Sequence, residues 1–441
     1  MILYSHNITS RLQYVADFIA KELQVDSFSI TSSEKEFSDY PGPRINYSDK
    51  QISATETWIK PHGLLFETGV REQNTGCFHV NGYKAFFKTG GDMPFDIFSA
   101  CFYLLSRYEE YLPHIKDSYG RYAHENSLAY KEKFLNQPLI NVWLQDFKKL
   151  LQQKFPQFTV IAIRQVAEKQ HESKFLPTYD IDIPWSYKHK GPWRNAGGFI
   201  RSLFKGQWPL LKERAMVLLR KQKDPFDAYD WLNKLHEQYR LKPYYFFLIP
   251  EKRGRYDKNI PPSSEAMQAL IHDHVARYPI GIHPSWKSGD DDSLLKKEIE
   301  TLSLFSGNPV VSSRQHYIRF NLPGGYRRLI VNGIKYDFSM GYGSINGFRA
   351  SVASPFYWYD LENEKQTGLM LFPFCYMEAN SFYEQNSTAK QALEEMRYYY
   401  WAVKSVNGHF IMIWHNSFLG TDKASKGWRD IYEQFIKEAT V

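Results

Sequence analysis

Cysteine is scarce in this chain of 441 residues, and long apolar runs are missing. The three cysteines, Cys77, Cys101 and Cys375, lie far apart and form no CxxC pair, which excludes a disulfide framework and a thiolate zinc site. No apolar run reaches the ~18 residues of a membrane helix, and the first residues lack a basic segment followed by an apolar one. We therefore expect a soluble protein of the reducing cytoplasm.

A strong excess of one charge is also missing. The chain has 55 basic and 48 acidic residues, and its net charge of +7 includes no Lys- and Arg-rich block of the nucleic-acid-binding type. This composition argues against a nucleic-acid partner and leaves the oligomeric state open.

One stretch is a local exception to the even distribution of charge. Residues 199–221 mix Phe, Ile, Leu and Trp with Arg and Lys. This pattern predicts either an amphipathic basic helix in peripheral contact with an anionic membrane, or a helical lid or helix pair inserted between two strands, with a break at Pro209.

Aromatic residues, in contrast, are abundant: 31 Tyr, 31 Phe and 11 Trp make up 17% of the chain. Their flat apolar faces with a polar edge suit sugar rings, although aromatic residues also fill cores. We expect at least one of Trp185, Trp286 and Trp414 to line a cleft, because each lies within three residues of a candidate catalytic residue. The alternative is that all three are core residues.

Residues 1–168 predict a smaller α+β domain. A short strand at residues 2–5 precedes an amphipathic helix at about 10–23, and a second long helix spans about 139–155. Asn81-Gly82 lies between alternating apolar residues, which predicts a hairpin with a type I′ turn. The domain boundary is expected at residues 165–173, and because this stretch has neither Gly nor Pro, we expect the two domains to pack firmly together.

Residues 169–441 predict an α/β domain with seven strands. Apolar runs lie near residues 174–183, 243–249, 278–283, 309–320, 334–340, 368–376 and 409–415, with helical patterns between most of them. This alternation is typical of a parallel sheet, either open or closed into a (β/α) barrel. In such folds the catalytic groups lie at the C-terminal ends of the strands.

Two carboxylates end the first of these runs. Asp180 and Asp182, in Thr178-Tyr-Asp-Ile-Asp-Ile-Pro-Trp185, are two residues apart and so point to the same face of an extended strand. Two carboxylates this close need a cation or a shared proton, and a divalent metal meets that need. The alternative is a pair of capping or turn aspartates on a surface loop.

Histidines occupy the ends of three other runs: His283, His316 and His415. A neutral imidazole is a good ligand for zinc, and an imidazole with a pKa near neutrality can act as a general acid. The glycine-rich loop from Asp337 to Arg349 could hold an ion pair that orients a catalytic carboxylate, although it matches no phosphate-binding pattern. The alternatives are core histidines and ordinary surface salt bridges.

This ordered set resembles the polysaccharide deacetylase (NodB homology) superfamily, carbohydrate esterase family four. Thr178-Tyr-Asp-Ile-Asp182 is similar to its first motif, Phe348-Arg349 to its arginine motif and Ile413-Trp-His415 to its final Leu-x-His motif. In the N-terminal part, Ser106-Arg-Tyr-Glu-Glu-Tyr111 is similar to a stretch of bacterial members that carry an additional domain of uncharacterised function.

The second motif of that family, His-Ser/Thr-x-x-His, is matched only in part. His283 fits, but Lys287 stands where the second metal-binding histidine belongs. Either His316 completes the metal site, or Lys287 supplies the positive charge in a metal-free site, or the chemistry has drifted.

The resemblance implies a seven-stranded (β/α) deacetylase-type barrel that holds a divalent metal, expected to be zinc. It implies a hydrolase that removes an N-acetyl or other small acyl group from an amino sugar of a bacterial glycan or glycan precursor. The alternatives are a catalytically degenerate carbohydrate-binding relative and a glycoside hydrolase. A glycoside hydrolase needs carboxyl groups roughly 5–10 Å apart, and Asp180 and Asp182 should be nearer neighbours.

The resemblance also assigns a role to each site residue. Asp182, His283 and His316 would hold the metal. Asp180 would accept a proton from water, His415 would protonate the leaving amine, and Arg349 would orient Asp180 or the oxyanion.

Overall fold

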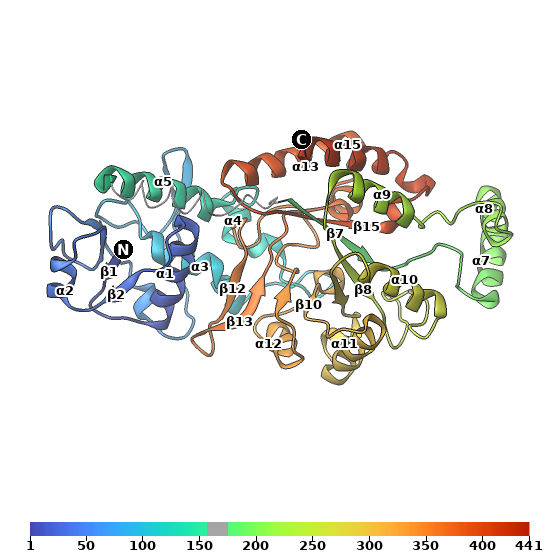
Figure 1. Ribbon diagram of the computed structural model, residues 1–441, viewed down its shortest axis with the longest axis horizontal. Helices are drawn as coiled ribbons and strands as arrows, with labels where there is room; N and C mark the ends of the chain where they lie inside the picture. The colour runs from blue at the N-terminus through green and yellow to red at the C-terminus, as the bar shows by residue number, and fades with distance from the viewer. Residues whose placement is uncertain (157–174, 441) are drawn as a thin grey trace.

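The computed structural model describes residues 1–156 and 175–440 and shows an elongated molecule (Figure 1). The N-terminal region lies at one end, a large sheet with its helices occupies the middle, and a pair of helices projects from the other end. The expected domain boundary at residues 165–173 lies outside the described residues.

The N-terminal region contains a four-stranded sheet in the order β2-β1-β3-β4. Its strands are β1 (Ile2–Tyr4), β2 (Ser29–Thr31), β3 (Arg44–Tyr47) and β4 (Thr57–Ile59). All three pairings are parallel, so the predicted α+β arrangement of this sheet is wrong and the region is of the α/β type. Strands of three or four residues are too short for their apolar pattern to reveal their pairing.

The helices of this region agree better with the sequence. Helix α1 (Ser10–Leu23) begins where Thr9 accepts a hydrogen bond from the backbone N–H of Leu12, and it has the predicted limits. The other elements are α2 (Glu34–Asp39), η1 (Leu64–Phe66), α3 (Ile97–Leu105), η2 (Tyr108–Tyr111), η3 (His124–Asn126), α4 (Leu128–Lys131) and α5 (Leu139–Lys154).

The predicted hairpin is confirmed. Strands β5 (Phe78–Val80) and β6 (Tyr83–Ala85) pair antiparallel. The connecting residues Asn81 and Gly82 have φ angles of 47° and 87°, and a type I′ turn requires a positive φ at both central positions.

The C-terminal region is organised around a nine-stranded sheet in the order β12-β13-β11-β10-β9-β8-β7-β15-β14. Its strands are β7 (Phe175–Ile181), β8 (Tyr244–Leu248), β9 (Ile280–His283), β10 (Ser312–Ser313), β11 (Tyr336–Asp337), β12 (Phe356–Asp360), β13 (Lys365–Leu371), β14 (Tyr376–Met377) and β15 (Phe410–His415). All pairings are parallel except β12 with β13.

The strand count differs from the predicted seven because of β12 and β14. Strand β12 runs back along β13 as an antiparallel edge, and the run predicted as one strand at 368–376 is divided, with β13 ending at Leu371 and β14 beginning at Tyr376. Among the described residues no pairing joins the edge strands β12 and β14, so the hydrogen-bonded ladder does not close into a barrel.

Helices connect most of these strands and cover the sheet (Figure 1). They are α9 (Tyr229–Tyr239), α10 (Glu265–Val275), α11 (Asp292–Ser306), α12 (Gly324–Val331), α13 (Ala389–Ser405), α14 (Asn416–Leu419) and α15 (Trp428–Thr440), with short turns η4 (Lys287–Gly289), η5 (His316–Ile318), η6 (Asn380–Glu384) and η7 (Lys423–Ser425).

Residues 199–221 belong to a helix pair inserted between β7 and β8, which was one of the two predicted alternatives. Helix α7 (Pro192–Phe204) and helix α8 (Trp208–Leu218) are separated by a turn at Gly206, whose φ is 64°. Pro209 lies in the first turn of α8 rather than at the break. In the part of the chain that is described, no helix is both long enough and apolar enough to cross a bilayer.

The N-terminal and C-terminal regions share one hydrophobic core, which includes side chains of α1, α3 and α5 together with side chains of β12 and β13. A buried ion pair also joins them: Arg349 makes two hydrogen bonds to Glu110, of 2.8 and 2.6 Å, and each side chain is 2% exposed. Glu110 also accepts from Arg107 at 2.8 Å, so the stretch Ser106–Tyr111 connects the two regions.

Candidate active site

The C-terminal ends of four parallel strands place their polar residues in one cleft. Asp182 follows β7, His283 is the last residue of β9, His316 follows β10, and His415 is the last residue of β15. All four line a cleft of about 640 Å³, within the usual size of small-molecule sites. The structure therefore brings these four residues together at the strand ends of a parallel sheet.

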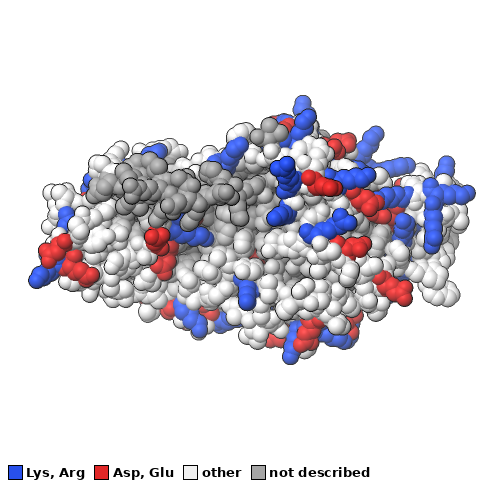
Figure 2. All heavy atoms as spheres, in the orientation of Figure 1, with Lys and Arg blue, Asp and Glu red and all other residues white. Residues whose placement is uncertain are grey.

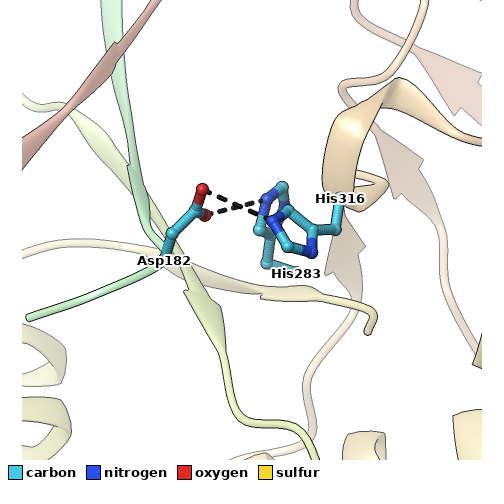
Figure 3. Close-up of side chains that lie close together, drawn as sticks. All are labelled: Asp182, His283 and His316. Atoms are coloured by element: carbon cyan, nitrogen blue, oxygen red, sulfur yellow. Dashed lines mark ion pairs between the residues drawn. The ribbon is translucent and has the colours of Figure 1, made fainter. Parts of the chain in front are cut away.

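Asp182, His283 and His316 point toward one another (Figure 3). Nε2 of His283 lies 3.2 Å from Oδ1 of Asp182, and Nε2 of His316 lies 3.4 Å from Oδ2 of the same carboxylate. The three prospective ligand atoms are all within 4.8 Å of one another. The structure thus brings His316 next to the other two candidate ligands. Lys287, which stands in the sequence where the family has its second histidine, is not among them.

The imidazoles of His283 and His316 are each held through Nδ1, while Nε2 faces Asp182. Nδ1 of His283 lies 2.6 Å from the carbonyl oxygen of Arg314, and Nδ1 of His316 lies 2.9 Å from Oδ1 of Asp257. Oxygen acceptors at these positions fix the proton on Nδ1, which leaves the Nε2 lone pair of a neutral imidazole directed at the centre.

The donor set fits a divalent cation such as zinc. Oδ1 of Asp182 is buried and accepts no hydrogen bond, although the Nε2 lone pair of His283 faces it at 3.2 Å. Two electron-rich atoms in this arrangement need a proton or a cation between them. One carboxylate and two imidazoles form the three-ligand set of many catalytic zinc sites.

The charges around the centre are strongly coupled. Burial alone would raise the pKa of Asp182, but the imidazoles of His316 and His415 hold it well below its usual value. Burial would lower the pKa of His316, whereas the carboxylates of Asp182 and Asp257 raise it to about 9. The carboxylates therefore make positive charge favourable at this point, whether it is carried by imidazolium or by a bound cation.

Asp180 lies beside this centre and is oriented by an arginine. Its Oδ1 accepts a hydrogen bond of 2.9 Å from Nη1 of Arg314, and its Oδ2 lies 3.8 Å from Nε2 of His283. Arg314 is fully buried and its guanidinium lies 4.4 Å from the ring centre of Phe246. The carboxylate is thus fixed at the floor of the cleft.

The arginine that contacts Asp180 is Arg314 and not Arg349, which was predicted to orient this carboxylate or the oxyanion. Arg349 is buried against Glu110 and donates to the carbonyl oxygen of Gly341, so its guanidinium is occupied at the contact between the two regions. Asp337 does not pair with Arg349 either, because it accepts hydrogen bonds from Ser313 and Ser339. Arg349 was chosen because Phe348-Arg349 is similar to the arginine motif of the family, whereas the contact between Arg314 and Asp180 leaves no pattern in the sequence.

His415 also lines the cleft, and a buried glutamate holds it there. Its Nδ1 lies 2.6 Å from Oε1 of Glu378, and its Nε2 lies 3.6 Å from Oδ2 of Asp182. Burial alone would lower the pKa of His415, but the carboxylates of Glu378 and Asp182 raise it to about 10. The imidazole is therefore favoured in its protonated form and is directed into the cleft.

Four tyrosines are among the residues that line the cleft. Tyr119 and Tyr317 stack with their ring centres 5.3 Å apart, and Tyr256 and Tyr383 also line the cleft. Tyr119 and Arg121 come from the N-terminal region, so both regions contribute to the wall. Arg121 reaches this position across Gly343, where a Cβ atom would lie 2.1 Å from its Nη1.

The tryptophan prediction is not met. None of Trp185, Trp286 and Trp414 is among the residues that line this cleft. Trp286 stacks behind Tyr256, with ring centres 3.9 Å apart, and Trp414 is fully buried next to Tyr432. The cleft is lined by tyrosine and phenylalanine side chains instead, among other residues.

Lys287 lies on the exposed side of the η4 turn and does not line the cleft. The alternative in which its ammonium group replaces the metal therefore has no geometric support. The positive charge close to Asp180 comes from Arg314.

Sequence reasoning missed three residues that contact candidate site residues: Arg314, which pairs with Asp180, and Asp257 and Glu378, the carboxylates behind His316 and His415. Glu378 could have been found, because it directly follows the apolar run 368–376 and strand β14. Asp257 could not, since it lies in a polar loop between β8 and α10 that has no periodic pattern.

We expect His316→Ala to weaken zinc binding by more than about 100-fold, because it removes one of three ligands. Asp257→Asn should weaken it by only about 10–100-fold, the usual effect of a carboxylate behind a ligand histidine. Competition with a fluorescent chelator measures both affinities. His272→Ala, at an exposed position of α10, is the matched control, and equal affinities of His316→Ala and this control would remove His316 from the site.

Residues 1–156 match the model of DUF7033, a family of unknown function. No curated protein matches the chain. Among solved structures, the chain is similar to a candidate polysaccharide deacetylase from Mycobacterium smegmatis, with 15% identity, a TM-score of 0.39, and coverage of 62% of this chain and 86% of that chain.

The chain is also similar to two further solved structures. For a polysaccharide deacetylase from Bacillus cereus the identity is 11% and the TM-score 0.31, over 60% of this chain and 88% of that chain. For a probable polysaccharide deacetylase from Pseudomonas aeruginosa they are 13% and 0.33, over 48% and 66%. Because these TM-scores are low, the function proposed below is based on the geometry of the site.

Proposed function

We propose that this protein is a metal-dependent hydrolase that removes an acetyl or other small acyl group from the nitrogen of an amino sugar. The observation that carries the proposal is Oδ1 of Asp182, which is buried, accepts no hydrogen bond and faces Nε2 of His283 at 3.2 Å, beside Asp180 and His415. A cation site, a proton acceptor and a proton donor in one cleft are what amide hydrolysis requires.

Asp182, His283 and His316 would hold the metal, with zinc as the first choice for this donor set. When bound there, a divalent ion would polarise the acyl carbonyl and make a water more acidic. Asp257 accepts the hydrogen bond from Nδ1 of His316 and so keeps the Nε2 lone pair of this histidine directed at the metal site.

Asp180 is the proton acceptor. Its carboxylate is held by Arg314 through Oδ1, which leaves Oδ2 free to take a proton from the attacking water. His415 is the proton donor, because Glu378 holds its Nδ1 and favours the imidazolium form, while Nε2 faces the cleft. Proton transfer from Nε2 to the departing nitrogen prevents expulsion of an unstable amide anion.

The tyrosines that line the cleft support an amino sugar as the substrate. Tyr119, Tyr256 and Tyr317 offer flat faces with hydroxyl edges, which suit a ring with apolar faces and hydroxyl groups around its edge. Both aspartates approach the same imidazole nitrogen, since Nε2 of His283 is 3.8 Å from Oδ2 of Asp180 and 3.2 Å from Oδ1 of Asp182. A glycoside hydrolase uses its two carboxyl groups across a sugar, whereas these two carboxylates both approach one imidazole, which favours the cation site.

Acetate release tests the proposal. The purified chain is incubated with N-acetylglucosamine oligosaccharides as isolated, after chelation, and after chelation followed by zinc. We expect acetate release in the first sample, loss in the second and recovery in the third. Binding of the oligosaccharides without acetate release in all three would favour the non-catalytic carbohydrate-binding relative.

A further inference from the structure

The helix pair formed by α7 and α8, within residues 188–223, projects from the body of the protein (Figure 1). The two helices pack against each other where Gly198 faces the guanidinium of Arg214, and a Cβ atom at position 198 would require this side chain to shift. The pair is therefore an ordered structure with a large surface outside the sheet domain.

Large apolar side chains of the helix pair are left exposed. Trp193 is 88% exposed, Phe204 87% and Trp208 65%, and Leu219, Ile200 and Leu203 are each more than half exposed. Single exposed apolar residues are common on proteins, but six large ones within residues 193–219 are typical of an interaction surface.

On α7 the apolar and basic residues form two parallel stripes. Trp193, Ile200 and Phe204 follow one another at intervals of seven and four residues, which places them within about 20° of one line along the helix. Arg194, Arg201 and Lys205 directly follow them in the sequence. The basic stripe therefore runs beside the apolar stripe, about 100° around the helix.

The charge of this segment is unlike that of the remaining chain. Residues 188–223 contain ten Lys or Arg and a single acidic residue, Glu213, which gives a net charge of +9. The whole chain has a net charge of +7, so the rest of it is slightly acidic. Figure 2 shows Lys and Arg side chains gathered at the end of the molecule where α7 and α8 lie.

We propose that the helix pair binds the surface of an anionic lipid bilayer, a role beyond the hydrolysis proposed above. Indole and phenyl groups enter the interface between headgroups and acyl chains, and the adjacent basic groups pair with anionic headgroups. A second copy of the chain is a poorer partner, because two surfaces of charge +9 repel each other. A nucleic acid would use the basic groups but leave the aliphatic side chains in water.

The helix pair is also tied to the cleft. Arg194 donates hydrogen bonds to the carbonyl oxygens of Lys258 and Asn259, and the side chain of Lys258 lines the cleft. Binding through the helix pair would therefore hold one wall of the cleft close to the lipid surface.

Co-sedimentation of the full chain with vesicles tests this inference. We expect the chain to sediment with vesicles of phosphatidylcholine containing one part in three phosphatidylglycerol, and to bind pure phosphatidylcholine at least tenfold more weakly. The triple variant Trp193→Ser, Phe204→Ser, Trp208→Ser should lose at least tenfold of the binding to the anionic vesicles. Trp401→Ser, at another position 59% exposed, is the matched control and should bind like the parent chain.

A second variant tests the electrostatic part. Arg201→Glu, Lys205→Glu, Lys212→Glu changes three exposed residues and should abolish binding to the anionic vesicles. Circular dichroism and acetate release, which do not depend on this surface, show whether the variants are folded. Unchanged vesicle binding by either triple variant would overturn the inference. The inference would also be overturned if the chain formed a dimer without lipid and the triple variant that includes Trp193→Ser abolished this dimer. It would likewise be overturned if the chain bound single-stranded DNA but not vesicles, and the same triple variant still bound the DNA.

Discussion

Asp180→Asn is expected to lower the turnover of N-acetylglucosamine oligosaccharides by about 10²–10⁴-fold, the usual contribution of general base catalysis, while zinc remains bound in stoichiometric amount. An asparagine side chain can still accept the hydrogen bond from Arg314, so the buried guanidinium keeps a partner. It has no basic oxygen, however, and therefore cannot take the proton of the attacking water. Acetate release and zinc content, measured on the same preparation, separate the loss of the base from the loss of the site.

The control for this experiment is Asp290→Asn. Asp290 is an exposed aspartate that pairs with Arg319, outside the residues that line the cleft. This variant should keep both turnover and zinc. Full activity of Asp180→Asn would remove Asp180 as the base, and a loss of zinc along with activity would mean that the side chain acts as a ligand.

Glu110→Gln is expected to lower the free energy of unfolding at pH 7 by about 3–5 kcal/mol, the usual effect of breaking a buried ion pair. Glu110 accepts hydrogen bonds from both Arg349 and Arg107, and its side chain is 2% exposed. Glutamine has the same size but no charge, so the guanidinium of Arg349 would remain buried without a counter-charge. Urea denaturation followed by circular dichroism measures the change.

The pH dependence distinguishes this effect from a loss of packing. Burial alone would raise the pKa of Glu110, but Arg349 and Arg107 lower it from 4.5 to about 2. A carboxylate whose pKa is lowered on folding contributes stability above its unfolded value and loses that contribution as the pH falls through the folded value. The difference between the parent chain and Glu110→Gln should therefore be constant above pH 5 and shrink as the pH falls from 4.5 toward 2.

Two further variants complete this experiment. Glu438→Gln breaks an exposed ion pair with Arg397 and should cost no more than about 1 kcal/mol. Adding Arg349→Met to Glu110→Gln removes the unpaired charge and should restore part of the lost stability. If the double variant is no more stable than Glu110→Gln, or if the difference persists at pH 2, the buried ion pair is not what holds this contact together.

The sequence allowed the location of residues at the ends of long apolar runs to be predicted. Asp182, His283 and His415 follow strands of four or more residues, and parallel strands bring their C-terminal ends to one edge of a sheet. His316 was predictable as well, although β10 has only two residues, because the run before it has the same apolar character. Their role as metal ligands and as a proton donor stays a prediction.

The partners of these residues were not predictable in the same way. Asp257 reaches His316 from a polar loop 59 positions away, and Arg314 reaches Asp180 across 134 positions. Contacts of this kind depend on how loops and side chains pack in three dimensions, and they leave no periodic signal in the sequence. For the same reason the sequence could not show that Arg349 turns toward Glu110.

The fold shows a similar limit. The helix at Ser10–Leu23 and the Asn81-Gly82 hairpin were predictable because local rules determine them. The parallel pairing of β1 to β4 and the antiparallel edge strand β12 depend on contacts between distant segments. Short strands carry too few residues for their pattern to reveal such contacts.

The pairing of Glu110 with Arg349 also bears on how the two halves of this chain can diverge. A substitution of either residue alone leaves a charge without its partner in the interior, so the two positions should change together or not at all. If recombination joined this N-terminal half to the C-terminal half of another protein, we expect a stable product only where that half has an arginine at the position of Arg349. The stretch from Ser106 to Tyr111 thus restricts which C-terminal halves can be combined with this N-terminal half. We expect the two halves to be inherited together.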